Sequence, residues 1–148
     1  MSRVNPAAVV VSGLVFWFIQ AGWYTALRQP YMAALGLTPD QVKAAMANAS
    51  ALPYITALLA DILVAYVISI VMRQSGAVVV SRGIIVAIVM WGGIVMTTLA
   101  TLYSFEQRPT TLLVINGGCA LVGMLACGII CGAWPRKEKA PTMVTAGA

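Results

Sequence analysis

The chain has 148 residues, of which 61% are hydrophobic and 9% are charged, and its mean hydropathy is +0.92. Soluble domains carry about 25% charged residues, and a chain this short has too much surface for its volume to bury so many apolar side chains in water. The composition therefore excludes an ordinary soluble domain. The net charge of +5 does not indicate a nucleic-acid partner, because the basic residues lie at the ends of apolar segments and are not interleaved with aromatic residues in one patch.

Four apolar segments are each long enough to cross a bilayer as a helix, which takes about 20 residues. We expect one all-α domain over residues 1–139, an integral membrane four-transmembrane-helix bundle. The predicted spans are residues 6–27, 52–72, 83–103 and 111–134. The first segment is longer than the apolar part of a signal peptide and carries aromatic residues where a cleavage site needs small ones, so we expect it to be retained. Residues 140–148 show no periodicity, and we expect this tail to be disordered.

The loop between the first two spans contains the signature of a short helix. Thr38, Pro39 and Gln41 have the spacing of a capping box with proline at the first helical position. The turns that follow place Val42 and Met46 on one face, which is typical of a helix that lies in the membrane interface.

The basic residues that flank the spans are divided unequally between the two sides of the membrane. The side with both termini has six: Arg3, Arg73, Arg82, Arg136, Lys137 and Lys139. The other side has three: Arg28, Lys43 and Arg108. The side richer in Lys and Arg is the cytoplasmic one. We therefore expect a multi-pass protein of the cell inner membrane, with the lipid bilayer as its surroundings and both termini in the cytoplasm.

Asp61 is the one acidic or basic residue within a predicted span, about halfway along the second. A charge at the bilayer centre costs about 2.5–3.5 kcal/mol on insertion scales. We therefore expect Asp61 to face the other helices and to find partners there, or to remain protonated. Ala57, Ala65 and Ser69 share its helix face, and small residues at four-residue spacing allow another helix to come close.

Other polar side chains lie in the outward half of the spans. They are Gln20, Tyr54, Thr97, Thr98, Thr101 and Asn116. We expect a polar vestibule that opens outward and ends at Asp61, about 14 Å below the outer end at 1.5 Å per residue. In one interpretation Asp61 titrates in a proton or cation site. In the other interpretation Asp61 is a hydrogen-bonded carboxylic acid that fixes helix packing. The predicted spans contain no second carboxylate, lysine or histidine for a proton pathway, and this absence favours the packing role.

The third and fourth spans are rich in small residues. Their glycines are Gly92, Gly93, Gly117, Gly118, Gly123, Gly128 and Gly132. We interpret them as close-packing surfaces, within the bundle or between subunits. Cys127 and Cys131 share a helix face, but a soft-metal site needs further ligands, so we expect them to serve packing as well. Histidine is absent, and we predict neither a metal site nor a cofactor.

Aromatic residues are placed at two depths in the predicted spans. Trp17 and Trp91 fall well inside their spans, where we expect core or lipid-facing bulk. Trp23, Tyr24 and Tyr103 fall near the span ends, where we expect their amphipathic rings to anchor the helices at the interfaces.

Several short runs of the chain stand out: Asn5-Pro6-Ala7, Gly22-Trp23-Tyr24, Leu35-Gly36-Leu37-Thr38, Pro53-Tyr54, and the segment from Phe105 through Ile115-Asn116-Gly117-Gly118 to Trp134. In these runs the chain resembles a bacterial family of small membrane proteins catalogued as domain of unknown function 1761. The family often has an aromatic residue and a histidine after the glycine of the fourth span, where this chain has Cys119 and Ala120. Any role of that histidine in relatives therefore cannot apply to this chain. The resemblance implies the four-helix architecture and no mechanism.

The sequence contains no nucleophile beside a base, no paired carboxylates and no phosphate-binding glycine motif, so we do not expect an enzyme. The leading hypothesis is a non-catalytic packing or accessory subunit that associates with itself or with another membrane protein. The alternative is a small proton- or cation-coupled transporter or channel that uses Asp61.

Overall fold

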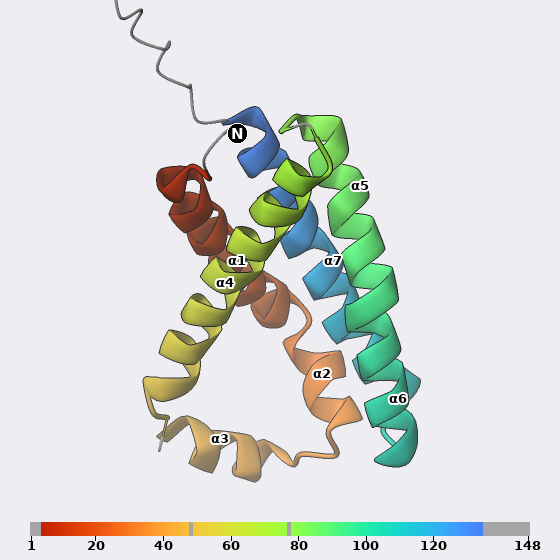
Figure 1. Cartoon of the computed structure of the whole chain (residues 1–148). Helices are drawn as coiled ribbons and strands as arrows, with labels where there is room; N and C mark the ends of the chain where they lie inside the picture. Colours follow the sequence, from red (N-terminus) through yellow and green to blue (C-terminus); the bar gives the residue numbers. More distant parts are fainter. Residues whose placement is uncertain (1–3, 48, 77, 135–148) are drawn as a thin grey trace, which may run out of the picture.

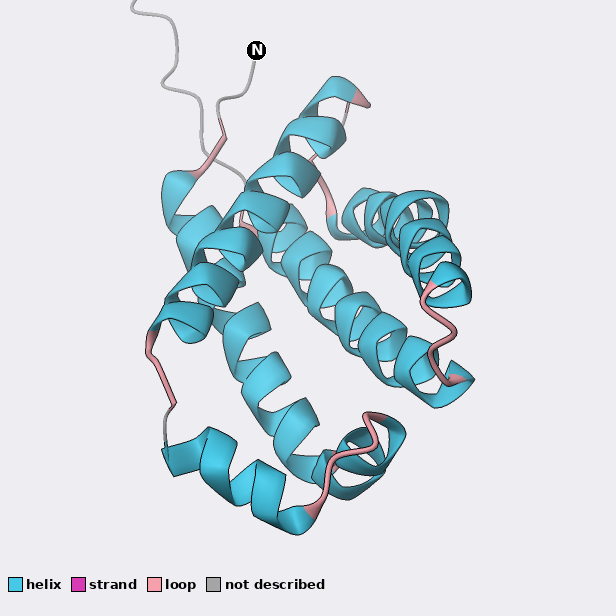
Figure 2. Ribbon diagram, turned by 90° about the horizontal axis from the view of Figure 1, so that it is seen from below, coloured by secondary structure: helices cyan, strands magenta, loops and turns pink. Residues whose placement is uncertain are grey.

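A computed structural model describes residues 4–47, 49–76 and 78–134. Every regular element in these residues is helical (Figure 2). Four helices are long and apolar enough to cross a membrane: Pro6–Ala26, Leu52–Gln74, Val80–Phe105 and Thr110–Ala133. The predicted all-helical membrane fold with four spans is therefore confirmed. The predicted disordered tail, residues 140–148, lies outside the described residues.

The helix α1 (Pro6–Ala26) is capped at its N-terminus by Asn5, whose side chain accepts hydrogen bonds from the backbone N–H groups of Ala7 and Ala8. The Asn5 amide also donates to the carbonyl oxygen of Trp134 at 3.1 Å, directly after α7 (Thr110–Ala133). The start of α1 and the end of α7 therefore lie at one end of the bundle, which we call the terminal end (Figure 1).

Two short helices occupy the loop after α1, at the opposite end of the bundle, which we call the α3 end (Figure 1). They are α2 (Arg28–Ala34), closed by Gly36 with φ +69°, and α3 (Pro39–Ala47). The predicted capping box is confirmed: the Thr38 N–H donates to Gln41 Oε1 at 2.9 Å, and the Gln41 N–H donates to Thr38 Oγ1 at 3.3 Å. That α3 lies in the membrane interface stays a prediction.

The fourth spanning helix, α7, is the centre of the bundle and packs against α1, α4 (Leu52–Gln74) and α5 (Val80–Met90). Its glycines allow this close packing. A Cβ atom on Gly128 would collide with the backbone of Gly83 on α5, and one on Gly123 would collide with the ring of Phe16 on α1. The predicted close packing along α7 is confirmed at these positions.

The third span is interrupted by a π-helical segment, η1 (Trp91–Met96), between α5 and α6 (Thr97–Phe105). Residues five apart lie about 140° apart around an α-helix, whereas the i→i+5 bonding of a π-helix brings them toward one face. Trp91 Nε1 donates to the Gly117 carbonyl at 2.7 Å, and Met96 Sδ fills the space that a Cβ of Gly117 would need. The segment therefore turns both side chains toward α7.

The bundle is packed tightly at the terminal end and opens toward the α3 end, where α4 diverges from α7 (Figure 1). The buried residues of α4 all lie between Asp61 and Met72. Before them, large side chains are exposed, including Leu52 at 67% and Leu59 at 63%. Asp61 is therefore the first residue of α4 that enters the packed part of the bundle.

Candidate functional site

Asp61 faces the interior of the bundle, as predicted, with 4% of its surface exposed. Gln20 on α1 donates from Nε2 to Asp61 Oδ1 at 2.7 Å. Asp61 Oδ2 is a buried oxygen with no hydrogen-bond partner in the described part of the chain. One oxygen of the carboxyl group therefore holds α1 against α4, and the other remains able to accept a hydrogen bond or carry a proton.

Gln20 also lines a partly open cavity of about 540 Å³ between α1, α2, α3 and the first turns of α4. Tyr54 belongs to the α4 wall of this cavity, and its carbonyl oxygen accepts a hydrogen bond from Trp17 Nε1 at 3.0 Å. The Tyr54 side chain is 60% exposed and makes no hydrogen bond to Asp61. Gln20 is thus the group that connects the cavity with Asp61.

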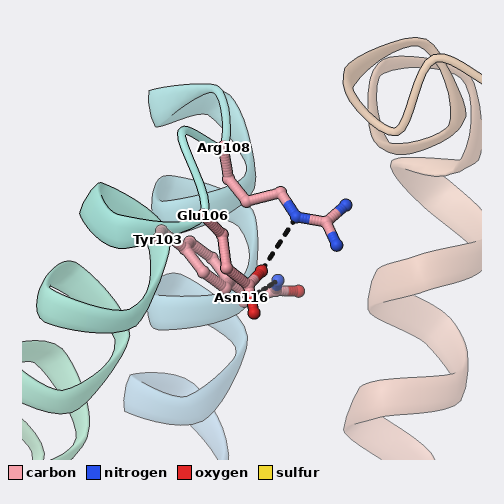
Figure 3. A network of polar contacts seen from close by, with 4 residues as sticks. All are labelled: Tyr103, Glu106, Arg108 and Asn116. Carbon is pink, nitrogen blue, oxygen red and sulfur yellow. Dashed lines mark hydrogen bonds and ion pairs between the residues drawn. The ribbon is translucent and has the colours of Figure 1, made fainter.

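Asn116 on α7 forms the centre of a second polar group, at the α3 end. Tyr24 on α1 donates to Asn116 Oδ1 at 2.8 Å. Asn116 Nδ2 donates to the hydroxyl of Tyr103 on α6 at 2.7 Å, as Figure 3 shows. Both sides of the amide are therefore satisfied, and three helices are joined at one residue. The group shares no hydrogen bond with Asp61 in the described ranges.

The rim next to this polar group carries an ion pair and a further aromatic contact. Arg108 Nε lies 3.0 Å from Glu106 Oε2 in the turn before α7 (Figure 3). The ring of Tyr31 on α2 packs edge-on against that of Tyr24, with 5.1 Å between the ring centroids. Burial raises the pKa of Tyr31 above its ordinary value.

Thr97 and Thr98 are exposed on the third span. The Thr97 hydroxyl donates to its own helix, at 2.8 Å to the Gly93 carbonyl and 3.0 Å to the Ile94 carbonyl. With Thr101 and two apolar side chains, the threonines line a shallow groove of about 450 Å³ that is separate from the cavity beside Gln20. Of the predicted vestibule residues, the structure thus brings only Gln20 into a hydrogen bond with Asp61.

The aromatic residues near the span ends have a role that the sequence prediction missed. Trp23, Tyr24 and Tyr103 were expected as interface anchors, but each bonds to α7, and Trp23 Nε1 donates to the Ile115 carbonyl at 3.0 Å. The signal that points to them is Asn116 itself, because a polar amide inside a membrane requires donors and acceptors from neighbouring helices.

The cysteines of α7 lie in the packed core. Cys127 is fully buried, and its thiol lies 3.6 Å from the carbonyl oxygen of Ser12. The Ser12 hydroxyl donates to the Ala8 carbonyl at 2.6 Å and lies 3.4 Å from Cys131 Sγ. These contacts confirm the packing role predicted for the two cysteines.

Comparison with protein families matches residues 7–132 to the family described as Protein of unknown function (DUF1761). No curated protein and no solved structure matches the chain. The matched segment contains all four spanning helices nearly to their ends, together with Asp61, Gln20 and Asn116. The chain therefore belongs to the DUF1761 family.

Proposed function

We propose that this protein is a non-catalytic membrane protein that works by associating with other membrane helices, as a homo-oligomer or as an accessory subunit. The observation that carries the proposal is the outward face of the third span. In the most apolar 18-residue stretch of Val80–Phe105, 17% of the residues are buried. In the corresponding stretch of α7, 39% are buried. A large part of the third span is therefore free to contact lipid or another protein.

The exposed face has the chemistry of a helix-packing surface along one line. Gly93, Thr97 and Thr101 follow at four-residue spacing, and all three are exposed. The hydrogen bond from Thr97 Oγ1 to the Gly93 carbonyl places these two residues one above the other. We call this line the Gly93–Thr101 stripe. Small residues at this spacing allow the backbones of two membrane helices to approach closely.

Packing within the chain does not account for Gly93 in this stripe or for its neighbour Gly92. A Cβ atom added to Gly92 or Gly93 would meet nothing within 4 Å, whereas one on Gly83, Gly117 or Gly128 would collide with a neighbouring helix. Close packing of Gly93 therefore requires a helix from outside the chain. A second copy of the chain offers the same stripe, and we take it as the first partner to test.

The test compares Gly93→Leu with Gly22→Leu by chemical crosslinking in native membranes. Gly22 on α1 is the matched control, because it is exposed and a Cβ atom there also meets nothing within 4 Å. We expect crosslinked oligomers in the unchanged protein and in Gly22→Leu, and their loss in Gly93→Leu. Oligomers that persist in Gly93→Leu would contradict association through this stripe, and the absence of any crosslink, to a second copy or to another protein, in all three proteins would contradict the proposal.

A non-catalytic role is supported by the use of the buried hydroxyl and thiol groups. Ser12 and Cys127 make their contacts with backbone carbonyl oxygens inside the core, where a substrate has no access. We further propose that the protein lies in the cell inner membrane with both termini in the cytoplasm. Arg28, Lys43 and Arg108 belong to the opposite, α3 end, whereas four of the six basic residues predicted on the cytoplasmic side lie outside the described residues.

Asp61 supports a second candidate function, a small proton- or cation-coupled transporter or channel. Asp61 Oδ2 lacks a hydrogen-bond partner in the described part of the chain, and Gln20 connects the carboxyl group with the cavity at the α3 end. The test is ion flux into liposomes with the unchanged protein and Asp61→Asn. Flux that disappears in Asp61→Asn supports transport, whereas equal flux in both proteins, or none in either, rejects it.

A further inference from the structure

The cavity between α1, α2, α3 and α4 has the size and wall chemistry of a ligand site. Its volume of about 540 Å³ lies within the range of small-molecule pockets, roughly 300–1,000 Å³. Its walls present three aromatic rings and two thioethers: Trp17, Tyr24, Tyr54, Met32 and Met46. Such a surface is complementary to an apolar ligand body.

Three polar side chains of the walls, Trp17, Tyr24 and Thr25, use their donor groups in hydrogen bonds within the protein, and most of the wall surface is apolar. Trp17 Nε1 bonds to the Tyr54 carbonyl at 3.0 Å, and the Tyr24 hydroxyl bonds to Asn116 at 2.8 Å. The Thr25 hydroxyl donates to the Ala21 carbonyl of its own helix at 2.6 Å. A ligand in contact with these residues therefore meets rings and hydrocarbon.

Among the described residues that line the cavity, Arg28 at the start of α2 is the one with a charged side chain. Its Nη2 atom lies 3.0 Å from the Met46 sulfur, which is a weak acceptor. In the part of the chain that the structure describes, no carboxylate pairs with Arg28, and Glu106 pairs with Arg108 instead. A guanidinium has five N–H donors in a planar fork that matches a carboxylate or phosphate. Arg28 is therefore free to bind an anionic group at the cavity.

We propose that this cavity binds a single-chain lipid anion, with its charged head on Arg28 and its acyl chain along Trp17 and Tyr54. The apolar walls select the chain, and the unpaired guanidinium selects the charge. The cavity volume suits one small ligand, so the lipid has a single acyl chain. The bilayer supplies such molecules directly to a cavity bounded by the exposed first turns of α4.

The test uses the full chain in an uncharged detergent and the quenching of tryptophan fluorescence by dibromostearate. Its methyl ester has the same brominated chain without the charge. We expect saturable quenching by the acid anion, with at least tenfold weaker binding of the ester. Trp17→Phe should remove most of the quenching, because Trp17 is the tryptophan that lines the cavity.

Arg28→Gln tests the charge of the site, Ala57→Phe tests its shape, and Arg108→Gln is the control for loss of an arginine outside the cavity lining. Arg28→Gln should weaken binding of the acid about tenfold and leave the ester unchanged, and Arg108→Gln should bind like the unchanged protein. Ala57→Phe, which keeps Arg28 and fills the cavity from α4, should weaken both ligands. Equal binding of acid and ester, unchanged binding in Arg28→Gln and Ala57→Phe, or quenching that persists in Trp17→Phe would overturn the proposal. Competition by inorganic phosphate as strong as by stearate would also overturn it, because it would indicate a free-anion site.

Discussion

Gly83 on α5 and Gly128 on α7 face each other so closely that a Cβ atom on either residue would collide with the carbonyl oxygen of the other. The backbones of these two helices are therefore in contact. Because Gly132 on α7 meets the backbone of Val79 and Val80 in the same way, the contact extends toward the terminal end of the bundle. Packing of this kind holds α5 to α7 in a solvent that provides no hydrophobic driving force between helices.

This contact predicts the effect of adding one methyl group. Gly83→Ala should lower the free energy of unfolding in detergent by about 1–3 kcal/mol, because the helices must separate to admit the new carbon. Gly92→Ala, on the third span with open space around it, should be neutral or slightly stabilising. Equal stability of the two variants would show that α5 and α7 are not in backbone contact.

The hydrogen bond between Gln20 and Asp61 predicts a non-additive pair of substitutions. Gln20→Leu removes the Nε2 donor to Asp61 Oδ1 and should destabilise the protein by about 1–3 kcal/mol. Replacing both residues by leucine should cost less than the sum of the single changes, because no unpaired polar group remains. A double-mutant cycle in detergent measures the coupling. Additive effects would mean that the two side chains do not interact.

Asn116 predicts a different pattern, because it serves two tyrosines. Asn116→Leu leaves the hydroxyl groups of Tyr24 and Tyr103 without their partner and should destabilise the protein more than either Tyr24→Phe or Tyr103→Phe. Thermal unfolding of the three variants measures their order of stability. A Tyr103→Phe variant less stable than Asn116→Leu would contradict the central position of Asn116.

How much of the fold the sequence predicts depends on whether a signal is local. The apolar segments, the Asn5 cap and the Thr38–Gln41 capping box depend on residues close in the chain, and the structure has all of them. The π-helical segment depends instead on contacts of Trp91 and Met96 with Gly117, a residue from another helix. Sequence spacing alone does not reveal such a tertiary requirement.

The candidate site, too, has features that the local sequence predicts and features that depend on tertiary contacts. The burial of Asp61 could be predicted, because an acidic residue in an apolar helix has to avoid lipid. Its partner Gln20 was one of several polar residues at similar depth, and only the crossing of α1 with α4 selects it. The cavity at Arg28 depends on how α2 and α3 fold back beside α1 and α4. The residue pattern of such short helices does not predict that arrangement.

The topology proposed from the basic residues predicts which loops are reached from each side. A cysteine introduced at Asp40 on α3 should react with a membrane-impermeant thiol reagent added to intact cells. A cysteine at Ser75, after α4, should react only when the membrane is permeabilised. The three native cysteines are buried and should contribute no background. The opposite labelling pattern would place both termini outside.

Disulfide scanning along the third span tests association through the Gly93–Thr101 stripe most directly. Single cysteines at each position from 92 to 102 are oxidised in native membranes, and the yield of crosslinked dimer is measured. We expect maxima at 93, 97 and 101, with little product at the intervening positions or at a control cysteine placed at Gly22. Uniformly low yields along the span, or maxima on another face of the helix, would contradict it.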